Sequence, residues 1–192
     1  MSSASNIAFL VAIVALFLST GDCLRAPNME LAHMDCSRIT YVENSTVTFY
    51  GGPDNDPPWN DATAYSCDPA RGFHAGGTGS YDDPLSFATA DDEEYETCEI
   101  VYSPFVKKYL RRDDFCATCK APHIDIWTGS SITNRHGDKQ LKCEERMTPD
   151  KGQRVIRNPP KNLPVNTKPL WDGFKCHTGR VHPGAKGPHC SK

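Results

Sequence analysis

The stretch HIDIWTG, residues 123–129, alternates isoleucine with polar and aromatic residues. Successive side chains of a β-strand point to opposite faces, so His123, Asp125 and Trp127 share one face and the two isoleucines share the other. The isoleucine face belongs in a hydrophobic core. The pattern therefore predicts a strand whose second face carries a base, an acid and a large aromatic ring.

A second strand is predicted over STVTFYG, residues 45–51, which is rich in the β-branched and aromatic residues that strands favour. Its alternation places Val47 and Phe49 on the core face, and Thr48 and Tyr50 on the other. Further along, the patterns predict a strand near residues 85–88, two strands within 98–116 broken near Ser103-Pro104, and a short helix near 143–147. A helix over residues 104–112 is the alternative for the middle segment.

The chain has 192 residues, which suits one domain preceded by a signal segment. The apolar run Ile7–Leu18 and the small residues after it are typical of a secretory signal peptide, although no Lys or Arg precedes the run. A membrane-anchored N-terminus is the alternative. The predicted organisation is a signal peptide at 1–23, an N-terminal tail at 24–44, a β-barrel domain at 45–150 and a Pro-rich, irregular C-terminal wrap at 151–192. We therefore expect a secreted, extracellular protein with no membrane contact after signal removal.

Nine cysteines favour an oxidising compartment. Cys23 lies at the predicted cleavage site, and the other eight are expected to form up to four disulfides, whose pairing stays open. These eight are Cys36, Cys67, Cys98, Cys116, Cys119, Cys143, Cys176 and Cys190. The C-x-x-C motif at 116–119 favours a structural disulfide over redox chemistry or zinc in an exported chain. The sequon Asn44-Ser45-Thr46 predicts glycosylation of Asn44 in a eukaryotic host.

The formal net charge of −3 gives no basic excess, so nucleic-acid binding is not expected. A basic cluster precedes Asp113-Asp114; local ion pairing is the plain explanation, and contact with an anionic polysaccharide is the alternative. The cluster comprises Lys107, Lys108, Arg111 and Arg112. Three C-terminal histidines and a cysteine match no zinc spacing: His177, His182, His189 and Cys190. The sequence therefore assigns no metal site and no cofactor, and it leaves open whether the C-terminal histidines use a metal. A monomer is expected.

Five residues on the polar faces of the two strands suit a sugar-binding groove. An aromatic ring stacks on a pyranose face, and a carboxyl group hydrogen-bonds hydroxyls or protonates a glycosidic oxygen. The five residues are Thr48, Tyr50, His123, Asp125 and Trp127. The structural alternative is that Asp125 bonds a buried loop and Trp127 fills the core.

The segment TFYGG at 48–52, followed by HIDI at 123–126, resembles the paired TFYGG and HFDL signatures of expansin-type double-psi β-barrels, a superfamily that includes barwin-like proteins. The resemblance covers about residues 45–130. It implies a mainly β fold: a small, disulfide-rich double-psi β-barrel with an irregular C-terminal extension. The block GGTGSYDDPLSFATA at 76–90 also resembles cysteine-rich secreted proteins of fungi and similar organisms.

One departure from the resemblance concerns catalysis. The related endoglucanases carry a second aspartate as general base, where this chain has Gly51-Gly52; Asp54 and Asp56 in the following loop could substitute. We therefore expect a non-hydrolytic, expansin-like protein that binds or loosens cell-wall polysaccharide, with Asp125 hydrogen-bonding and the two aromatic rings stacking. One alternative is a weak glycosidase or lytic enzyme with Asp125 as general acid. The other is a secreted effector or inhibitor that binds a host protein.

Overall fold

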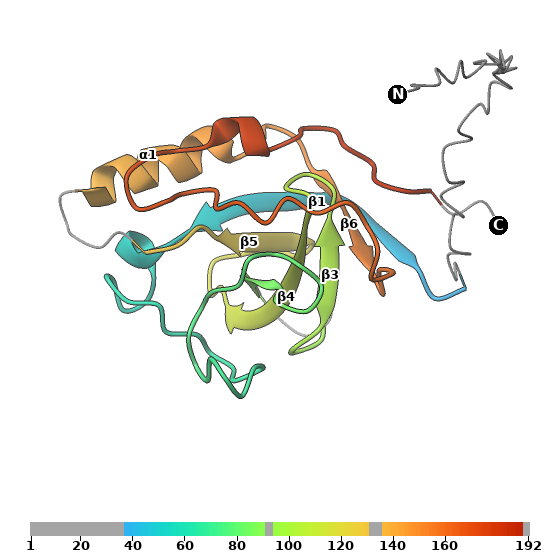
Figure 1. The fold of residues 1–192 in the computed structure, drawn as a ribbon, viewed down its shortest axis with the longest axis horizontal. Helices are drawn as coiled ribbons and strands as arrows, with labels where there is room; N and C mark the ends of the chain where they lie inside the picture. Colours follow the sequence, from blue (N-terminus) through green and yellow to red (C-terminus); the bar gives the residue numbers. More distant parts are fainter. Residues whose placement is uncertain (1–36, 91–93, 131–135, 190–192) are drawn as a thin grey trace, which may run out of the picture. The chain divides into compact units, whose positions relative to one another are not determined.

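The computed structural model describes residues 37–90, 94–130 and 136–189 (Figure 1). The predicted signal peptide at 1–23 lies outside these ranges, as do Cys36 and Cys190. No helix in the described ranges is long and apolar enough to span a membrane.

The described part of the chain forms a closed barrel of six strands in the order β1-β5-β2-β4-β3-β6. The strands are β1 (Thr40–Tyr50), β2 (Leu85–Thr89), β3 (Ile100–Ser103), β4 (Lys108–Phe115), β5 (His123–Trp127) and β6 (Gln153–Arg157). The pairs β1·β5 and β2·β4 are parallel, and the other neighbours are antiparallel. The predicted fold class, a small mainly β, disulfide-rich barrel with an irregular C-terminal extension, is confirmed.

The barrel extends beyond the predicted domain limits at both ends. β1 begins at Thr40, within the predicted tail, and pairs there with β6, which lies within the predicted C-terminal wrap. The register of this pairing shifts between Val42 and Ser45, and Asn44 at the shift has a left-handed φ of 58°. This bulge interrupts the alternation by which the strand could be followed in the sequence. The limits 45 and 150 are therefore wrong for the barrel, which runs from β1 to β6.

The segment after Cys98 forms an antiparallel hairpin, β3 and β4, with Pro104 in its connection. The predicted pair of strands is confirmed, and the alternative helix over 104–112 is wrong. Pro104 lacks a backbone N–H, so it lies where the strand ladder is already broken. Lys107, with a φ of 50°, completes the turn.

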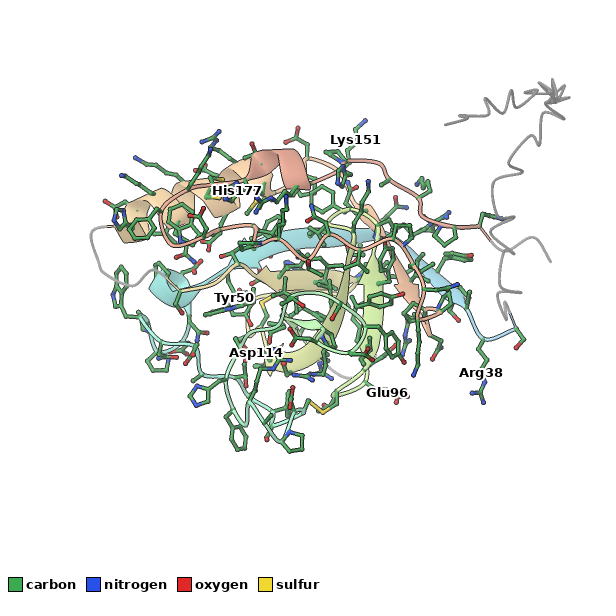
Figure 2. All side chains as sticks on the ribbon, viewed as in Figure 1. Arg38, Tyr50, Glu96, Asp114, Lys151 and His177 are labelled. Carbon is green, nitrogen blue, oxygen red and sulfur yellow. A yellow bond between two sulfur atoms is a disulfide. The ribbon has the colours of Figure 1, made fainter. Side chains whose placement is uncertain are left out.

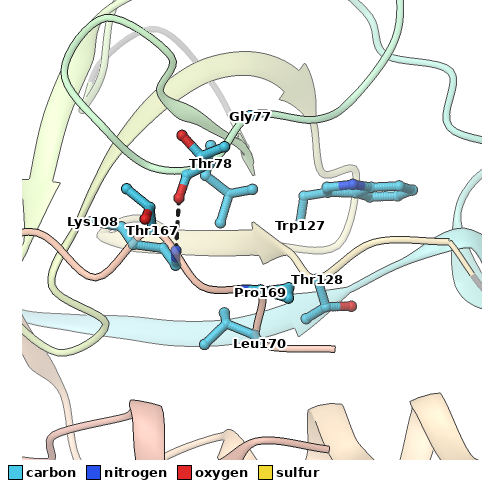
Figure 3. Close-up of a pocket in the computed structure, with 9 residues that line it drawn as sticks. Gly77, Thr78, Lys108, Trp127, Thr128, Thr167, Pro169 and Leu170 are labelled. Carbon is cyan, nitrogen blue, oxygen red and sulfur yellow. Dashed lines mark hydrogen bonds between the residues drawn. The ribbon is translucent and has the colours of Figure 1, made fainter. Parts of the chain in front are cut away.

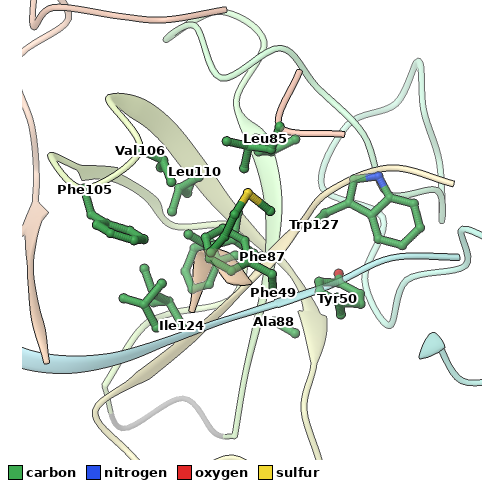
Figure 4. Close-up of a cluster of buried hydrophobic side chains, with 14 of the residues drawn as sticks. Phe49, Tyr50, Leu85, Phe87, Ala88, Phe105, Val106, Leu110, Ile124 and Trp127 are labelled. Atoms are coloured by element: carbon green, nitrogen blue, oxygen red, sulfur yellow. The ribbon is translucent and has the colours of Figure 1, made fainter. Parts of the chain in front are cut away.

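The main hydrophobic core fills the inside of the barrel (Figure 4). The parallel register of β1 and β5 sets Val47 opposite Ile124 and Phe49 opposite Ile126, and all four side chains are buried. Phe87 on β2 lies among them. The apolar face predicted for each of the two strands is therefore in the core.

The helix α1 (Gly137–Met147) packs against β1 and against the short 3-10 helix η1 (Gly52–Asp54). It begins six residues before the predicted short helix at 143–147. The C-terminal extension after β6 contains only the 3-10 helix η3 (Thr178–Arg180) among its described residues, and it runs back beside α1 in Figure 1. The Tyr102 hydroxyl holds the extension to the barrel by donating to the Pro164 carbonyl at 2.6 Å.

Three disulfides join described cysteines: Cys67–Cys98, Cys116–Cys119 and Cys143–Cys176. The first and third close loops with sequence separations of 31 and 33, whereas the second spans a separation of 3. Loop-closure entropy assigns about 4 kcal/mol to each long bridge and about 2 kcal/mol to the short one. The two cysteines of the C-x-x-C motif are therefore in a disulfide, as expected; they pair with each other, which the sequence left open, and this bridge contributes the least to fold stability.

Candidate functional site

Three of the predicted site residues meet through the parallel register of β1 and β5, which sets Thr48 opposite Asp125. The Thr48 hydroxyl donates to Asp125 Oδ1 at 2.6 Å and lies 2.8 Å from His123 Nε2. A hydroxyl has one hydrogen to give, so His123 Nε2 donates to Thr48. Burial lowers the pKa of His123, which favours the neutral ring in this chain of hydrogen bonds.

Asp125 faces a cavity of about 410 Å³, which we call the acidic pocket. Its described lining includes the four aspartates Asp54, Asp56, Asp114 and Asp125. Phe115, the last residue of β4, and residues 116–118 of the following loop also line it. No Lys, Arg or His lies among the described lining residues. The pocket is therefore negatively charged when its carboxyl groups ionise.

Burial raises the pKa of Asp125 to about 6, and the charges of Asp54 and Asp114 add to that shift while the Thr48 hydrogen bond opposes it. The pKa of Asp54 is also raised by burial, against a hydrogen bond from the Gly51 N–H at 2.9 Å. A carboxyl group with a pKa of about 6 exchanges its proton under mild conditions. Asp125 can thus act as a hydrogen-bond donor or a general acid.

Tyr50 is held inside the pocket wall rather than presented to a ligand. Its hydroxyl donates to Asp114 Oδ2 at 2.8 Å, and Figure 2 shows the two residues together. Burial and the neighbouring Asp114 charge raise the pKa of Tyr50 well above its usual value. Only 6% of the residue is exposed, so the expected stacking of its ring on a ligand is wrong.

Trp127 does not lie on the acidic pocket. It is 4% exposed, meets the Tyr50 ring edge-on at 5.1 Å, and lines a second cavity of about 170 Å³ (Figure 3). Pro169 and Leu170 of the C-terminal extension line the same cavity, and Trp127 belongs to the main hydrophobic core. The expectation of a common exposed face for Asp125 and Trp127 is therefore wrong, and the structural alternative that Trp127 fills the core is confirmed.

The second cavity, the lysine pocket, contains Lys108, which is 2% exposed. Its Nζ donates to the Thr78 carbonyl at 2.7 Å and to the Asn166 carbonyl at 2.5 Å, and burial lowers its pKa to about 8. Arg111 and Arg112 are buried too, and Arg111 pairs with Asp113 at 3.2 Å. Ion pairing thus explains Arg111, and burial leaves Lys107 as the one exposed side chain of this cluster for the alternative contact with an anionic polysaccharide.

Glu144 on α1 is a buried carboxyl group that the sequence patterns did not single out. Its Oε1 lies 2.6 Å from Thr128 Oγ1, whose single hydrogen can instead be donated to the Tyr50 carbonyl at 2.9 Å. If Glu144 is protonated, its carboxyl O–H donates to Thr128 Oγ1 across the 2.6 Å contact. Burial and the charge of Asp54 raise its pKa to about 8, in agreement with this arrangement.

The glycine at the position of the expected second aspartate has a packing role. A Cβ at Gly51 would lie 1.8 Å from Gln140 Nε2, which donates from α1 to the Gly129 carbonyl at 2.6 Å. An aspartate at this position would displace the helix side chain. Asp54, three residues later, brings a carboxyl group to the acidic pocket instead.

Phe115, at the end of β4, lines the acidic pocket and is 50% exposed. Neither Phe115 nor the role of Asp114 follows from the sequence patterns, because Asp113 and Asp114 both read as partners of the basic cluster. Alternation along β4 would have separated the two aspartates. The register of β4 with β2 shifts between Phe87 and Ala88, so simple alternation does not extend to the end of β4.

Other predicted sites stay apart from the acidic pocket. His177 Nε2 contacts Asp172 Oδ2 at 2.8 Å, while Asn44 is exposed on β1.

Within the described ranges, one group of three residues lies close enough together to hold a metal ion, namely Cys116, Cys119 and Asp125 beside the acidic pocket. The two sulfurs of that group are bonded to each other.

The fold and pocket define a disulfide-stapled, closed β-barrel with an acidic pocket near the carboxyl ends of β1 and β5. The family model of the DDB_G0273701 N-terminal domain matches residues 42–179, from β1 to η3, and the chain belongs to this family. No curated protein and no solved structure matches the chain.

Proposed function

We propose that the chain is a secreted, expansin-like protein that binds a cell-wall polysaccharide in the acidic pocket without hydrolysing it. The observation that carries the proposal is Asp125, a carboxyl group held by Thr48 at the wall of an open cavity of about 410 Å³. Disulfides support the extracellular setting, since they persist in oxidising compartments.

The chemistry of the pocket suits sugar hydroxyls, which both donate and accept hydrogen bonds. A protonated Asp125 donates, and the remaining aspartates accept. Phe115, with half of its surface exposed, offers a ring on which the apolar face of a pyranose can stack. Four aspartates with no cation in the described lining favour a neutral or cationic polymer over an anionic one.

Retention on insoluble cellulose, chitin and peptidoglycan tests this proposal, with the mature, disulfide-intact protein. Phe115→Ala is expected to weaken the affinity for the polymer about fivefold, because one stacking ring contributes about 1 kcal/mol. Phe73→Ala is the matched control, since Phe73 is 58% exposed and does not line the pocket. Equal retention of the two variants would contradict a role for the pocket.

A second candidate is a weak glycosidase, favoured by the position of Asp54 on the same pocket as Asp125. An inverting mechanism needs an acid and a base about 6.5–9.5 Å apart. Asp125 would protonate the glycosidic oxygen, and Asp54 would activate water. Reducing sugar released in the same tubes tests this, and both Asp125→Asn and Asp54→Asn should abolish it. Release that survives Asp54→Asn but not Asp125→Asn would indicate lytic cleavage by a single acid.

The remaining alternative is a secreted effector or inhibitor with a host protein as partner. It predicts that the wild-type protein is retained on none of the three polymers. That result would overturn the carbohydrate proposal.

A further inference from the structure

The C-x-x-C disulfide borders the acidic pocket, where no part of the proposed carbohydrate function uses it. Cys116 lines the pocket, and both sulfurs and a carboxylate oxygen of Asp125 lie within 4.8 Å of one another. Cys116 is partly exposed, and the two residues that follow it are exposed. A reductant can therefore approach this disulfide from solvent.

The barrel does not depend on this bond for its connections. The Cys116 N–H donates to the Thr89 carbonyl at 3.0 Å, which holds the start of the loop to β2. The loop also follows β4 and precedes β5, both of which are fixed in the barrel. With a sequence separation of 3, the bridge restricts much less of the chain than the two long disulfides do. Opening it should leave the fold in place.

We infer that Cys116–Cys119 is a redox-active disulfide that oxidises a dithiol, and that Asp125 provides the proton for the sulfur that leaves. The substrate class is a molecule with two neighbouring thiols. This activity goes beyond carbohydrate binding and does not require it.

The electrons and protons balance as follows. A thiolate of the dithiol attacks one sulfur of the disulfide, a mixed disulfide forms, and the Cys116–Cys119 bond breaks. The departing sulfur takes a proton from the Asp125 carboxyl group and becomes a thiol. The second thiol of the substrate loses its proton to the Asp125 carboxylate and attacks the mixed disulfide, which releases the other cysteine; that cysteine takes a proton from solvent. The substrate leaves as a disulfide, oxidised by two electrons, and the protein is left as a dithiol.

The surroundings of Asp125 hold its proton in mildly acidic conditions. The titratable groups that act on it or lie against it come from β1, η1, β4, β5 and α1: Tyr50, Asp54, Asp114, His123 and Glu144. Burial together with the nearby carboxylates keeps the pKa of Asp125 near 6. Below that pH the group can donate a proton, and above it the carboxylate opposes formation of a neighbouring thiolate.

The test is reduction of the full, disulfide-intact protein by limiting dithiothreitol, followed by alkylation and mass mapping of the free cysteines. Cys116 and Cys119 should become alkylated about tenfold faster than the four other mapped cysteines. Asp125→Asn should slow this opening about tenfold at about pH 5, and the ratio of wild-type to variant rate should fall to one or below at about pH 8. Asp82→Asn, which changes an exposed aspartate, is the matched control and should behave as wild type.

Two results would overturn the inference. One is wild-type protein in which the C-x-x-C disulfide opens no faster than the long ones, a comparison that needs no variant. The other is a rate ratio for Asp125→Asn that does not change with pH, which would show that accessibility alone governs opening. Neither result bears on polymer retention, so the carbohydrate proposal stands or falls separately.

Discussion

The acidic pocket and the lysine pocket adjoin the same pair of aromatic rings but differ in how their charged groups are satisfied. Tyr50 lines the first and Trp127 the second, and the rings meet at 5.1 Å. In the lysine pocket, Lys108 directs two of its three N–H donors to backbone carbonyls. In the acidic pocket, four carboxyl groups line an open cavity, and burial, with the charges of Asp54 and Asp114 in addition, raises the pKa of Asp125.

The difference separates a structural charge from a functional one. Lys108 fastens the C-terminal extension to the barrel through Asn166, and its surroundings are supplied by the chain itself. Asp125 is held in a state that is costly for the fold and gains from a ligand or a reacting group. The burial of a charged side chain beside a cavity therefore does not by itself identify the functional site.

The largest expected effect concerns the wall between the two pockets. Trp127→Ala should lower the free energy of unfolding by about 3–5 kcal/mol, because a buried indole is replaced by a cavity. Urea unfolding followed by circular dichroism measures this. Phe73→Ala, at an exposed aromatic, should change stability by less than about 1 kcal/mol. A small effect of Trp127→Ala would mean that the indole is not packed in the hydrophobic core.

Glu144 links the two pockets, since it contacts Thr128 of the lysine pocket and the charges of the acidic pocket act on it. Its pKa rises from 4.5 to about 8 on folding. The folded state thus holds a proton that the unfolded chain loses between these values, so the free energy of unfolding falls as the pH rises through that window.

Glu144→Gln removes this penalty. The variant should be more stable than wild type by about 1–3 kcal/mol at about pH 9, and nearly unchanged at about pH 4. Thermal unfolding at both pH values measures the difference. Glu145→Gln on the exposed side of α1 should show no such pH dependence.

The smallest effect sharpens the contrast between the pockets. Lys108→Met should lower the free energy of unfolding by about 1–2 kcal/mol, because the Thr78 and Asn166 carbonyls lose their donor. The methionine side chain still fills the space of the lysine methylenes. Polymer retention should not change, since Lys108 lies outside the acidic pocket. A loss of retention in folded Lys108→Met protein would move the binding site to the lysine pocket.

The sequence predicted the part of the site that rests on strand alternation. The isoleucine face of β5 and the meeting of Thr48, His123 and Asp125 follow from side chains that alternate on two paired strands. The sequence left open whether Trp127 is exposed or in the core, because alternation along one strand does not show what packs against each end of a face; residues far along the chain, Pro169 and Leu170, line the cavity beside it. Sequence alternation likewise carries no information on which loops bring Asp54 and Phe115 to one cavity.

The fold was predicted to the extent that its strands are regular. The pairing of β1 with β6 was missed because a bulge at Asn44 breaks the alternation of β1. In β6, the adjacent residues Val155 and Ile156 are both buried, so that strand shows no period of two. Tertiary pairing, rather than local pattern, determines both segments.

The measurement that tests the central claim most directly is polymer retention of wild-type and Asp125→Asn protein as a function of pH. The pKa of Asp125, raised by burial to about 6, makes its carboxyl group a hydrogen-bond donor below that value and an acceptor only above it. Wild-type retention should therefore fall as the pH rises through about 6, whereas the amide of the variant donates throughout and its retention should stay level. Wild-type retention that does not change across this range, or that changes equally in the variant, would contradict binding through Asp125.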